Sequence, residues 1–407
     1  MNTPEKPALQ RRLGVVDAVT IGLGSMIGAG IFVVLAPAAA AAGSTLLLAL
    51  VIAAVVAYCN ATSSARLAAL YPQSGGTYVY GRERLGEFWG YLAGWSFIVG
   101  KTASCAAMAL TVGVYAWPEH AHAVAVAAVV ALTALNYRGI QKSAVLTRVI
   151  VALVLAVLVA VVVAVLGDWT VRLDPGSALS DNGIGGMLQG AGLLFFAFAG
   201  YARIATLGEE VRDPRRTIPL AIPIALGITL VVYAAVASAV GLQLGAGLTT
   251  SSAPLADAVR AAGHPGLEPV IRVGAAVAAV GSLLSLILGV SRTTLAMARD
   301  RHLPHVLAAV HPRFGGPHRA EVAVGAVVAV LAAFADVRAA IGFSAFTVLV
   351  YYAIANASAM TLRGRVIPVI GLAGCILLAA LLPLASVLAG AGVVVSGAAV
   401  YAVRLLR

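Results

Sequence analysis

Apolar runs long enough to cross a membrane recur along nearly the whole chain, and this feature constrains the fold most. Residues 145–166 form one such run, which reaches the roughly 20 residues that a helix needs to span a hydrocarbon core. Of the 407 residues, 61% are hydrophobic and only 11% are charged, whereas soluble domains are about 25% charged. A soluble fold has too little interior to bury this much apolar surface. The sequence therefore predicts an all-α integral membrane protein.

Twelve segments are predicted to be membrane-spanning helices from their apolar length and from the Gly, Pro and charged residues between them. A polar segment, residues 1–12, leads directly into the first span, so we expect that helix to be retained and not cleaved as a signal peptide. One membrane domain is expected over residues 1–407. The predicted spans are residues 13–41, 45–70, 86–116, 121–137, 143–167, 184–211, 217–243, 267–299, 319–335, 337–362, 366–381 and 384–405.

Basic residues determine the predicted orientation. Most of the 27 Lys and Arg residues fall on segments of one side, and only Arg172, Arg260, Arg272 and Arg338 fall on the other. By the positive-inside rule, both termini are cytoplasmic and the protein is a multi-pass protein of the inner, cytoplasmic membrane. The net charge of +11 is dispersed over inner loops beside the membrane, so we expect lipid contact and no nucleic-acid partner.

Glycines interrupt two of the predicted spans. The first span contains Gly22, Gly24, Gly28 and Gly30, and each glycine weakens a helix by about 1 kcal/mol relative to Ala. The sixth span has Gly200 at its middle. Close helix packing is one explanation. Breaks at corresponding positions of two five-span halves, residues 13–167 and 184–362, instead indicate an inverted-repeat transporter with two extra helices in residues 366–405.

Broken helices of this kind present backbone groups to a ligand. The amides near Gly28 and Gly30 are expected to receive a carboxylate, and the carbonyls near Ala199 and Gly200 are expected to accept from an ammonium. An α-amino acid carries both charges, so the sequence predicts a secondary transporter of amino acids.

The residues around these breaks resemble the amino acid, polyamine and organocation (APC) transporter family. The similar segments are GSMIGAGIF at residues 24–32, FFAFAGY at 195–201, IATLGEEVRDP at 204–214, ARDRHLP at 298–304 and HPR at 311–313. The resemblance implies a LeuT-like five-plus-five inverted repeat, with substrate bound between spans one and six. Phe196 matches the family's aromatic gate, although a packing role is also open. The implied substrate-binding residues are Ser25, Met26, Ile27, Gly28, Ala29, Gly30, Phe196, Phe198, Ala199, Gly200 and Tyr201.

Three departures from the family bear on substrate and coupling. Ala202 stands where several relatives have an acidic residue, which favours neutral amino acids over cationic amino acids or polyamines. Lys101 lies halfway through span three, where an ionisable group facing lipid costs at least about 2.5 to 3.5 kcal/mol. It is expected to carry a coupling proton or attract a substrate carboxylate, and the alternative is a structural lysine held by an ion pair or by backbone carbonyls. Arg148 matches the span-five lysine that replaces sodium in relatives, and a snorkelling Arg148 is the alternative. Ser282 and Ser285 are candidates for lining that cation site, unless they only bond the backbone of their own helix.

Other classes were weighed against transport. Glu209 and Glu210 follow the sixth break and are expected to latch an inner gate, unless they form an exposed charge cluster. A channel would show repeated polar pore stripes, and an enzyme would show a catalytic set such as HExxH; the sequence has neither, whereas a non-transporting sensor stays open. Cys59, Cys105 and Cys375 lack metal-type spacing, and we expect no metal or cofactor. Symport, exchange and oligomeric state are left open.

Overall fold

The computed structural model describes residues 13–71, 75–138, 144–167, 179–201, 204 and 211–406. Within these ranges the chain is built from helices and contains no β-strand. Among the described residues, nine helical segments are long and apolar enough to cross a membrane, and Val15–Met26 and Val366–Ala380 are shorter apolar helices. The prediction of an all-α membrane protein is confirmed.

Ten of the predicted spans match single observed helices to within a few residues. The first span is divided into two helices, and the α-helix of the sixth span ends at Phe198, with most of the rest of that span outside the described residues. The bounds of the observed helices are α1 Val15–Met26, α2 Gly30–Ala42, α3 Leu46–Leu70, α5 Glu87–Ala116, α6 Ala121–Tyr137, α7 Ala144–Leu166, α8 Gly183–Phe198, α10 Pro214–Leu244, α12 Glu268–Arg299, α13 His318–Phe334, α14 Val337–Met360, α15 Val366–Ala380 and α16 Leu384–Leu405. Two short helices, α4 (Thr77–Leu85) and α11 (Pro254–Ala261), were not predicted, because they lie in connections and have no membrane-length apolar run. The division into two repeats stays a prediction.

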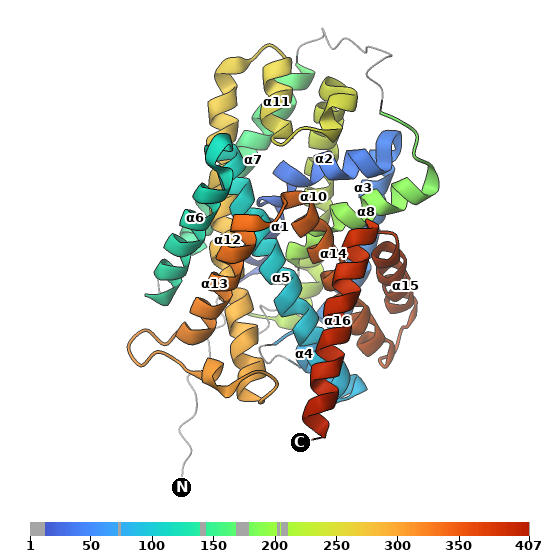
Figure 1. Ribbon diagram of the computed structural model, residues 1–407. Coiled ribbons are helices and arrows are strands. Elements are labelled where there is room, and N and C mark those ends of the chain that lie inside the picture. The colour runs from blue at the N-terminus through green and yellow to red at the C-terminus, as the bar shows by residue number, and fades with distance from the viewer. Residues whose placement is uncertain are drawn as a thin grey trace.

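The helices form one bundle (Figure 1), in which α1 packs against α10 and α7. The helix α5 crosses the bundle and packs against α14 and α12, while α2 and α3 both pack against α8. The helices α15 and α16 lie at one edge. Side chains such as Val149, Val159 and Val163 on α7 point out of the bundle, which is the pattern of a helix that faces lipid.

Small and polar residues allow the helices to approach closely. A Cβ atom added at Gly100 on α5 would overlap the Thr347 hydroxyl of α14. One turn further along α5, the Ser104 and Ser344 hydroxyls are 2.6 Å apart. Hydrogen bonds of this kind join membrane helices because lipid tails provide no hydrophobic force between them. They fix α5, and therefore Lys101, against the rest of the bundle.

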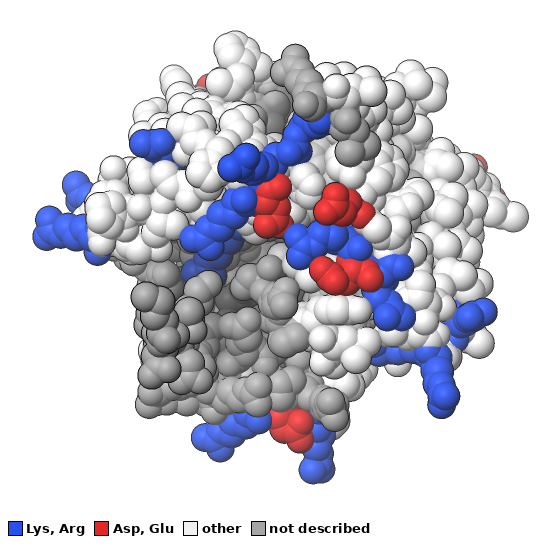
Figure 2. All heavy atoms as spheres, turned by 90° about the horizontal axis from the view of Figure 1, so that it is seen from below, with Lys and Arg blue, Asp and Glu red and all other residues white. Residues whose placement is uncertain are grey.

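One end of the molecule carries α4 and the C-terminus, and α11 lies at the other end (Figure 1). We call the end with α4 the predicted cytoplasmic face; it includes Arg82, Arg148, Asp300 and Arg404. Figure 2 shows Lys and Arg side chains scattered over this face, with Asp and Glu side chains between several of them. The orientation of this face toward the cytoplasm stays a prediction of the positive-inside rule.

Gly30 provides a test of the close approach between α2 and α8. A Cβ atom at Gly30 would lie 2.9 Å from the Ala197 Cα, a contact that flexible side chains cannot relieve. We expect Gly30→Ala to lower the free energy of unfolding by about 1–3 kcal/mol, measured by thermal unfolding in detergent. Gly227→Ala in α10 is the control, because a Cβ atom there meets nothing within 4 Å. Equal stability of the two variants would contradict the contact.

Candidate functional site

The first predicted break is present between α1 and α2. The α-helix α1 ends at Met26, residues 27–29 are not helical, and α2 begins at Gly30. The Ile27 amide makes the last helical bond of α1, to the Leu23 carbonyl (2.7 Å). The Gly28 amide departs from the helical pattern and donates to the Met26 carbonyl (2.8 Å). The first amides of α2 lack helical partners one turn earlier. The break therefore offers amide donors and carbonyl acceptors at the middle of the bundle.

The second break begins where α8 ends at Phe198. A 3₁₀ turn follows over Ala199–Tyr201. Among the residues after it, only 204 is described before residue 211, so the predicted gate residues Glu209 and Glu210, together with Ala202, lie outside the described part of the chain. The predicted interruption at Gly200 coincides with this change from α-helix to 3₁₀ turn.

The two breaks lie against each other. A Cβ atom at Gly200 would overlap the Ser25 carbonyl at the end of α1, and the Met26 amide lies next to it. On the other side of the break, Gly30 approaches the Ala197 backbone. Glycine at both positions is required because the two backbones occupy the space of a side chain. The structure thus brings together the two predicted segments, residues 25–30 and 196–201.

Lys101 is placed beside the second break. Its side chain is buried in α5, and its Nζ donates to the Ala199 carbonyl at 3.5 Å. No Asp or Glu oxygen of the described residues lies within 4.0 Å of this ammonium. A buried cation held by a single long hydrogen bond to a carbonyl is only partly compensated. Such a group can release its proton or take an anionic partner.

The predicted aromatic residues differ in their surroundings. Phe196 is buried within the main apolar core. The Phe198 ring packs 5.3 Å from the ring of Tyr233, and the Tyr201 ring packs 5.1 Å from the ring of Tyr352. All of them line or support the second break, and the gating role of Phe196 stays a prediction.

The predicted cation-site residues are not gathered together. Ser282 of α12 does lie at the first break, because a Cβ atom at Gly28 would overlap its hydroxyl. The Ser285 hydroxyl donates to the Gly281 carbonyl of its own helix (3.1 Å). Arg148 has a side chain that is 55% exposed, and its Nη2 is 2.5 Å from Asp17 Oδ1. The guanidinium is therefore placed at the predicted cytoplasmic end of α1, where it forms an ion pair.

Tyr233 of α10 belongs to this site, and the sequence reasoning missed it. Its buried hydroxyl donates to the Met26 carbonyl (2.6 Å) and also lies 3.3 Å from the Ala197 carbonyl, so it joins the two breaks. Tyr115 similarly donates to the Phe32 carbonyl at 2.8 Å. A tyrosine inside an apolar span was the available signal, since a buried phenol hydroxyl requires a partner.

A helix break that faces the end of another helix inside a membrane bundle is a feature of secondary-transporter folds. Among the described residues, no group of three His, Cys, Asp or Glu side chains is placed to hold a metal ion. In the described part of the chain, the chemistry at the breaks is that of backbone dipoles, the Tyr233 and Ser282 hydroxyls and the Lys101 ammonium.

Comparison with known proteins places the chain in a family. A family model described as amino acid permease matches residues 13–403. The chain is 71% identical to an uncharacterized transporter of Mycobacterium tuberculosis (strain ATCC 25618 / H37Rv), over 97% of this chain and 92% of that protein. It is 26% identical to a methylthioribose transporter of Bacillus subtilis (strain 168), over 80% and 76% of the two chains. It is 28% identical to the chloroplastic cationic amino acid transporter 7 of Arabidopsis thaliana, over 86% and 65%.

The chain belongs to the amino acid permease family, within the APC superfamily. The resemblance found in the sequence is thereby confirmed, and the protein is a multi-pass membrane transporter of the amino acid transport class.

Tyr233→Phe tests the hydroxyl that joins the breaks. Removing it leaves the Met26 and Ala197 carbonyls with one donor fewer, so we expect the free energy of unfolding to fall by about 1 kcal/mol in thermal unfolding experiments. Tyr58→Phe on the lipid-facing side of α3 is the matched control, since Tyr58 is 41% exposed. A Tyr233→Phe protein as stable as the control would show that the breaks do not depend on this hydroxyl.

Proposed function

We propose that this protein is a secondary active transporter that carries neutral α-amino acids across the cytoplasmic membrane by alternating access. The observation that carries the proposal is the contact between the two helix breaks at Gly200 and Ser25. Amide groups at the start of α2 are suited to a substrate carboxylate, and carbonyls at the ends of α1 and α8 are suited to a substrate ammonium. An α-amino acid needs no ionised protein side chain at such a site.

Lys101 favours a neutral over a cationic substrate side chain. Its ammonium is buried and lies 3.5 Å from the Ala199 carbonyl, so it already supplies positive charge beside the second break. A second cation, such as an arginine side chain or a polyamine, would be repelled in this low-dielectric region. Cationic amino acids and polyamines are therefore the alternative substrates that the transport assay below has to exclude.

Lys101 is also proposed as the coupling group. Lysine can release its proton when it is buried, whereas arginine keeps its charge. Arg148 is exposed and paired with Asp17, so it is a poor candidate for a buried cation-site residue. Proton symport and amino-acid exchange both remain compatible with a lysine at this position, and they differ in whether its protonation changes during transport.

Two variants of Lys101 separate charge from proton transfer. The assay is accumulation of neutral amino acids in proteoliposomes, driven by an inward proton gradient. We expect Lys101→Met and Lys101→Arg each to reduce this accumulation by about tenfold or more. Lys101→Arg keeps the charge and is expected to retain exchange against amino acid loaded inside. Lys101→Met is expected to weaken both this exchange and gradient-driven accumulation. Ser285→Ala serves as the control, because that hydroxyl bonds within its own helix.

The outcomes that contradict the proposal are distinct. Gradient-driven uptake by Lys101→Arg would exclude Lys101 as the coupling group. Wild-type transport that requires internal amino acid, whatever the gradient, would identify an exchanger and exclude proton coupling through Lys101. Uptake of arginine or putrescine in preference to neutral amino acids would overturn the substrate class, and specific binding without uptake would identify a sensor.

The Asp17–Arg148 ion pair is proposed as part of the inner gate. It joins α1 to α7, and near it the Arg212 amide donates to the Leu13 carbonyl at 3.0 Å. Both contacts hold the predicted cytoplasmic end of α1, which has to move for that side to open. An exposed pair of this kind contributes about 0–1 kcal/mol, so its effect on opening is at most about fivefold.

A double-mutant cycle tests this gate. We expect Asp17→Asn and Arg148→Gln each to change the uptake rate by at most about fivefold. The double variant is expected to have the same uptake rate as either single variant, because all three lack the same ion pair. Raised salt should reduce the difference from wild type by screening. Additive effects of the two substitutions would mean that the residues act separately.

A further inference from the structure

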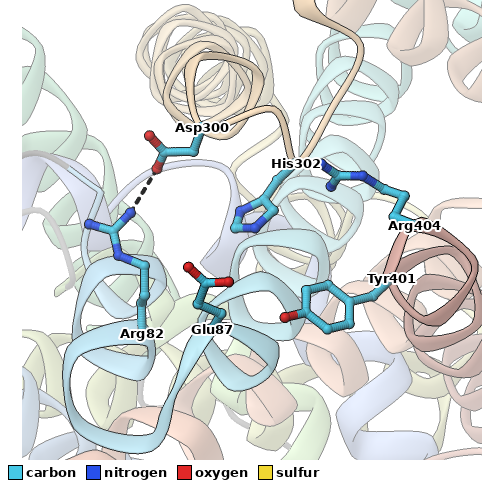
Figure 3. Close-up of a pocket in the computed structure, with 6 residues that line it drawn as sticks. All are labelled: Arg82, Glu87, Asp300, His302, Tyr401 and Arg404. Atoms are coloured by element: carbon cyan, nitrogen blue, oxygen red, sulfur yellow. Dashed lines mark hydrogen bonds and ion pairs between the residues drawn. The ribbon is translucent and has the colours of Figure 1, made fainter. Parts of the chain in front are cut away.

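A polar cavity lies at the predicted cytoplasmic face, away from the helix breaks. It has a volume of 410 Å³ and is lined by Arg82, Glu87, Asp300, His302, Tyr401 and Arg404. Figure 3 shows these side chains reaching it from three parts of the fold: α4 and the start of α5, the segment after α12, and the end of α16. The cavity therefore joins the edge helix α16 to the body of the bundle.

One pair of charges in the cavity is already neutralised. Arg82 Nη1 is 2.8 Å from Asp300 Oδ2 (Figure 3), and the Tyr78 hydroxyl donates to the same oxygen at 2.5 Å. His302 Nδ1 lies 2.8 Å from the Tyr78 hydroxyl. Burial, and then the nearby Arg404 charge, lower the pKa of His302 below its ordinary value. This wall of the cavity is therefore uncharged overall at neutral pH.

Two opposite charges remain. Within the described part of the chain, no Lys, Arg or His nitrogen lies within 4.0 Å of the Glu87 carboxylate, and no carboxylate lies within 4.0 Å of the Arg404 guanidinium. One Arg404 nitrogen donates to the Arg301 carbonyl, which orients the guanidinium and leaves other donors available. Glu87 and Arg404 line one cavity without pairing, which is complementary to a ligand that carries both an ammonium and an anionic group.

The position of the cavity favours a lipid over a dissolved ligand. The helix α16 lies at the edge of the bundle (Figure 1). Only 17% of the residues in its most apolar stretch are buried. Val403 and Leu406 beside Arg404 are exposed, and so is Trp89 beside Glu87. Exposed tryptophan and apolar side chains next to charged ones are typical of the boundary where lipid headgroups lie. A headgroup in the cavity would leave its acyl chains free to follow the apolar surface of α16.

We propose that this cavity binds the headgroup of an aminophospholipid, with the primary ammonium on Glu87 and the phosphate on Arg404. A primary ammonium donates charge-assisted hydrogen bonds to a carboxylate, whereas the quaternary ammonium of a choline lipid has no N–H to donate. The phosphate of an anionic lipid without an amine would bind Arg404, but such a lipid has no ammonium to donate to the Glu87 carboxylate. The same zwitterionic chemistry occurs in dissolved molecules such as phosphoethanolamine, and the experiment has to separate the two sources.

Native mass spectrometry of the whole protein tests the site. The protein is released from micelles that contain equal amounts of phosphatidylethanolamine, phosphatidylcholine and phosphatidylglycerol. We expect wild type to retain phosphatidylethanolamine about tenfold over the other two. Glu87→Gln should abolish this preference, while Arg404→Gln should reduce retention of all three lipids because the phosphate is common to them. Glu119→Gln, the same substitution at an exposed residue of the opposite face, should behave as wild type.

A second measurement separates this role from a purely structural one. Thermal unfolding is compared in nanodiscs of phosphatidylethanolamine and of phosphatidylcholine with the same acyl chains. We expect wild type to unfold at a higher temperature in phosphatidylethanolamine than in phosphatidylcholine. Glu87→Gln is expected to unfold at the same temperature in the two lipids, even if that temperature is lower than for wild type. A preference that survives in Glu87→Gln, or equal retention of all lipids by wild type, would overturn the proposal. Displacement of the lipid by millimolar phosphoethanolamine would assign the site to a dissolved ligand instead.

Discussion

Every backbone amide and carbonyl inside the hydrocarbon needs a partner within the protein, and the arrangement of the site depends on this constraint. The two helix breaks expose groups that an intact helix would satisfy, so they are tolerated only where protein surrounds them. The structure meets this requirement by placing the breaks against each other, with the Tyr233 hydroxyl and the Lys101 ammonium donating to their carbonyls. In the proposed function, a substrate would replace these groups as the partner of the breaks.

Burial separates the two basic residues that the sequence singled out. Lys101 lies beside the second break, and Arg148 lies at an exposed end where Asp17 neutralises it. A buried lysine is sensitive to its surroundings because its charge costs free energy in a low dielectric, whereas an exposed arginine pair changes stability little. Proton coupling is therefore proposed for Lys101, and a role in the inner gate for Arg148.

Much of the fold could be predicted because lipid requires long apolar helices, and such runs are visible in the sequence. Even the interruption near Gly28 was predictable, since glycines in a span weaken the helix where function needs a break. Tyr233 was not predictable as a site residue, because its partners on α1 and α8 are distant along the chain. The helices α4 and α11 were missed for a different reason, because short polar or amphipathic helices have no apolar run of spanning length.

The sequence by itself determined the membrane class, the spans, the positions of the breaks and the family resemblance, because each depends on local composition or on a contiguous motif. Only the tertiary structure decided which groups meet: that Lys101 reaches the Ala199 carbonyl, that Arg148 pairs with Asp17, and that Glu87 and Arg404 face one cavity. The physical reason is that hydropathy and helix propensity act over neighbouring residues, whereas hydrogen bonds and ion pairs between helices depend on how each helix is rotated and packed against the others.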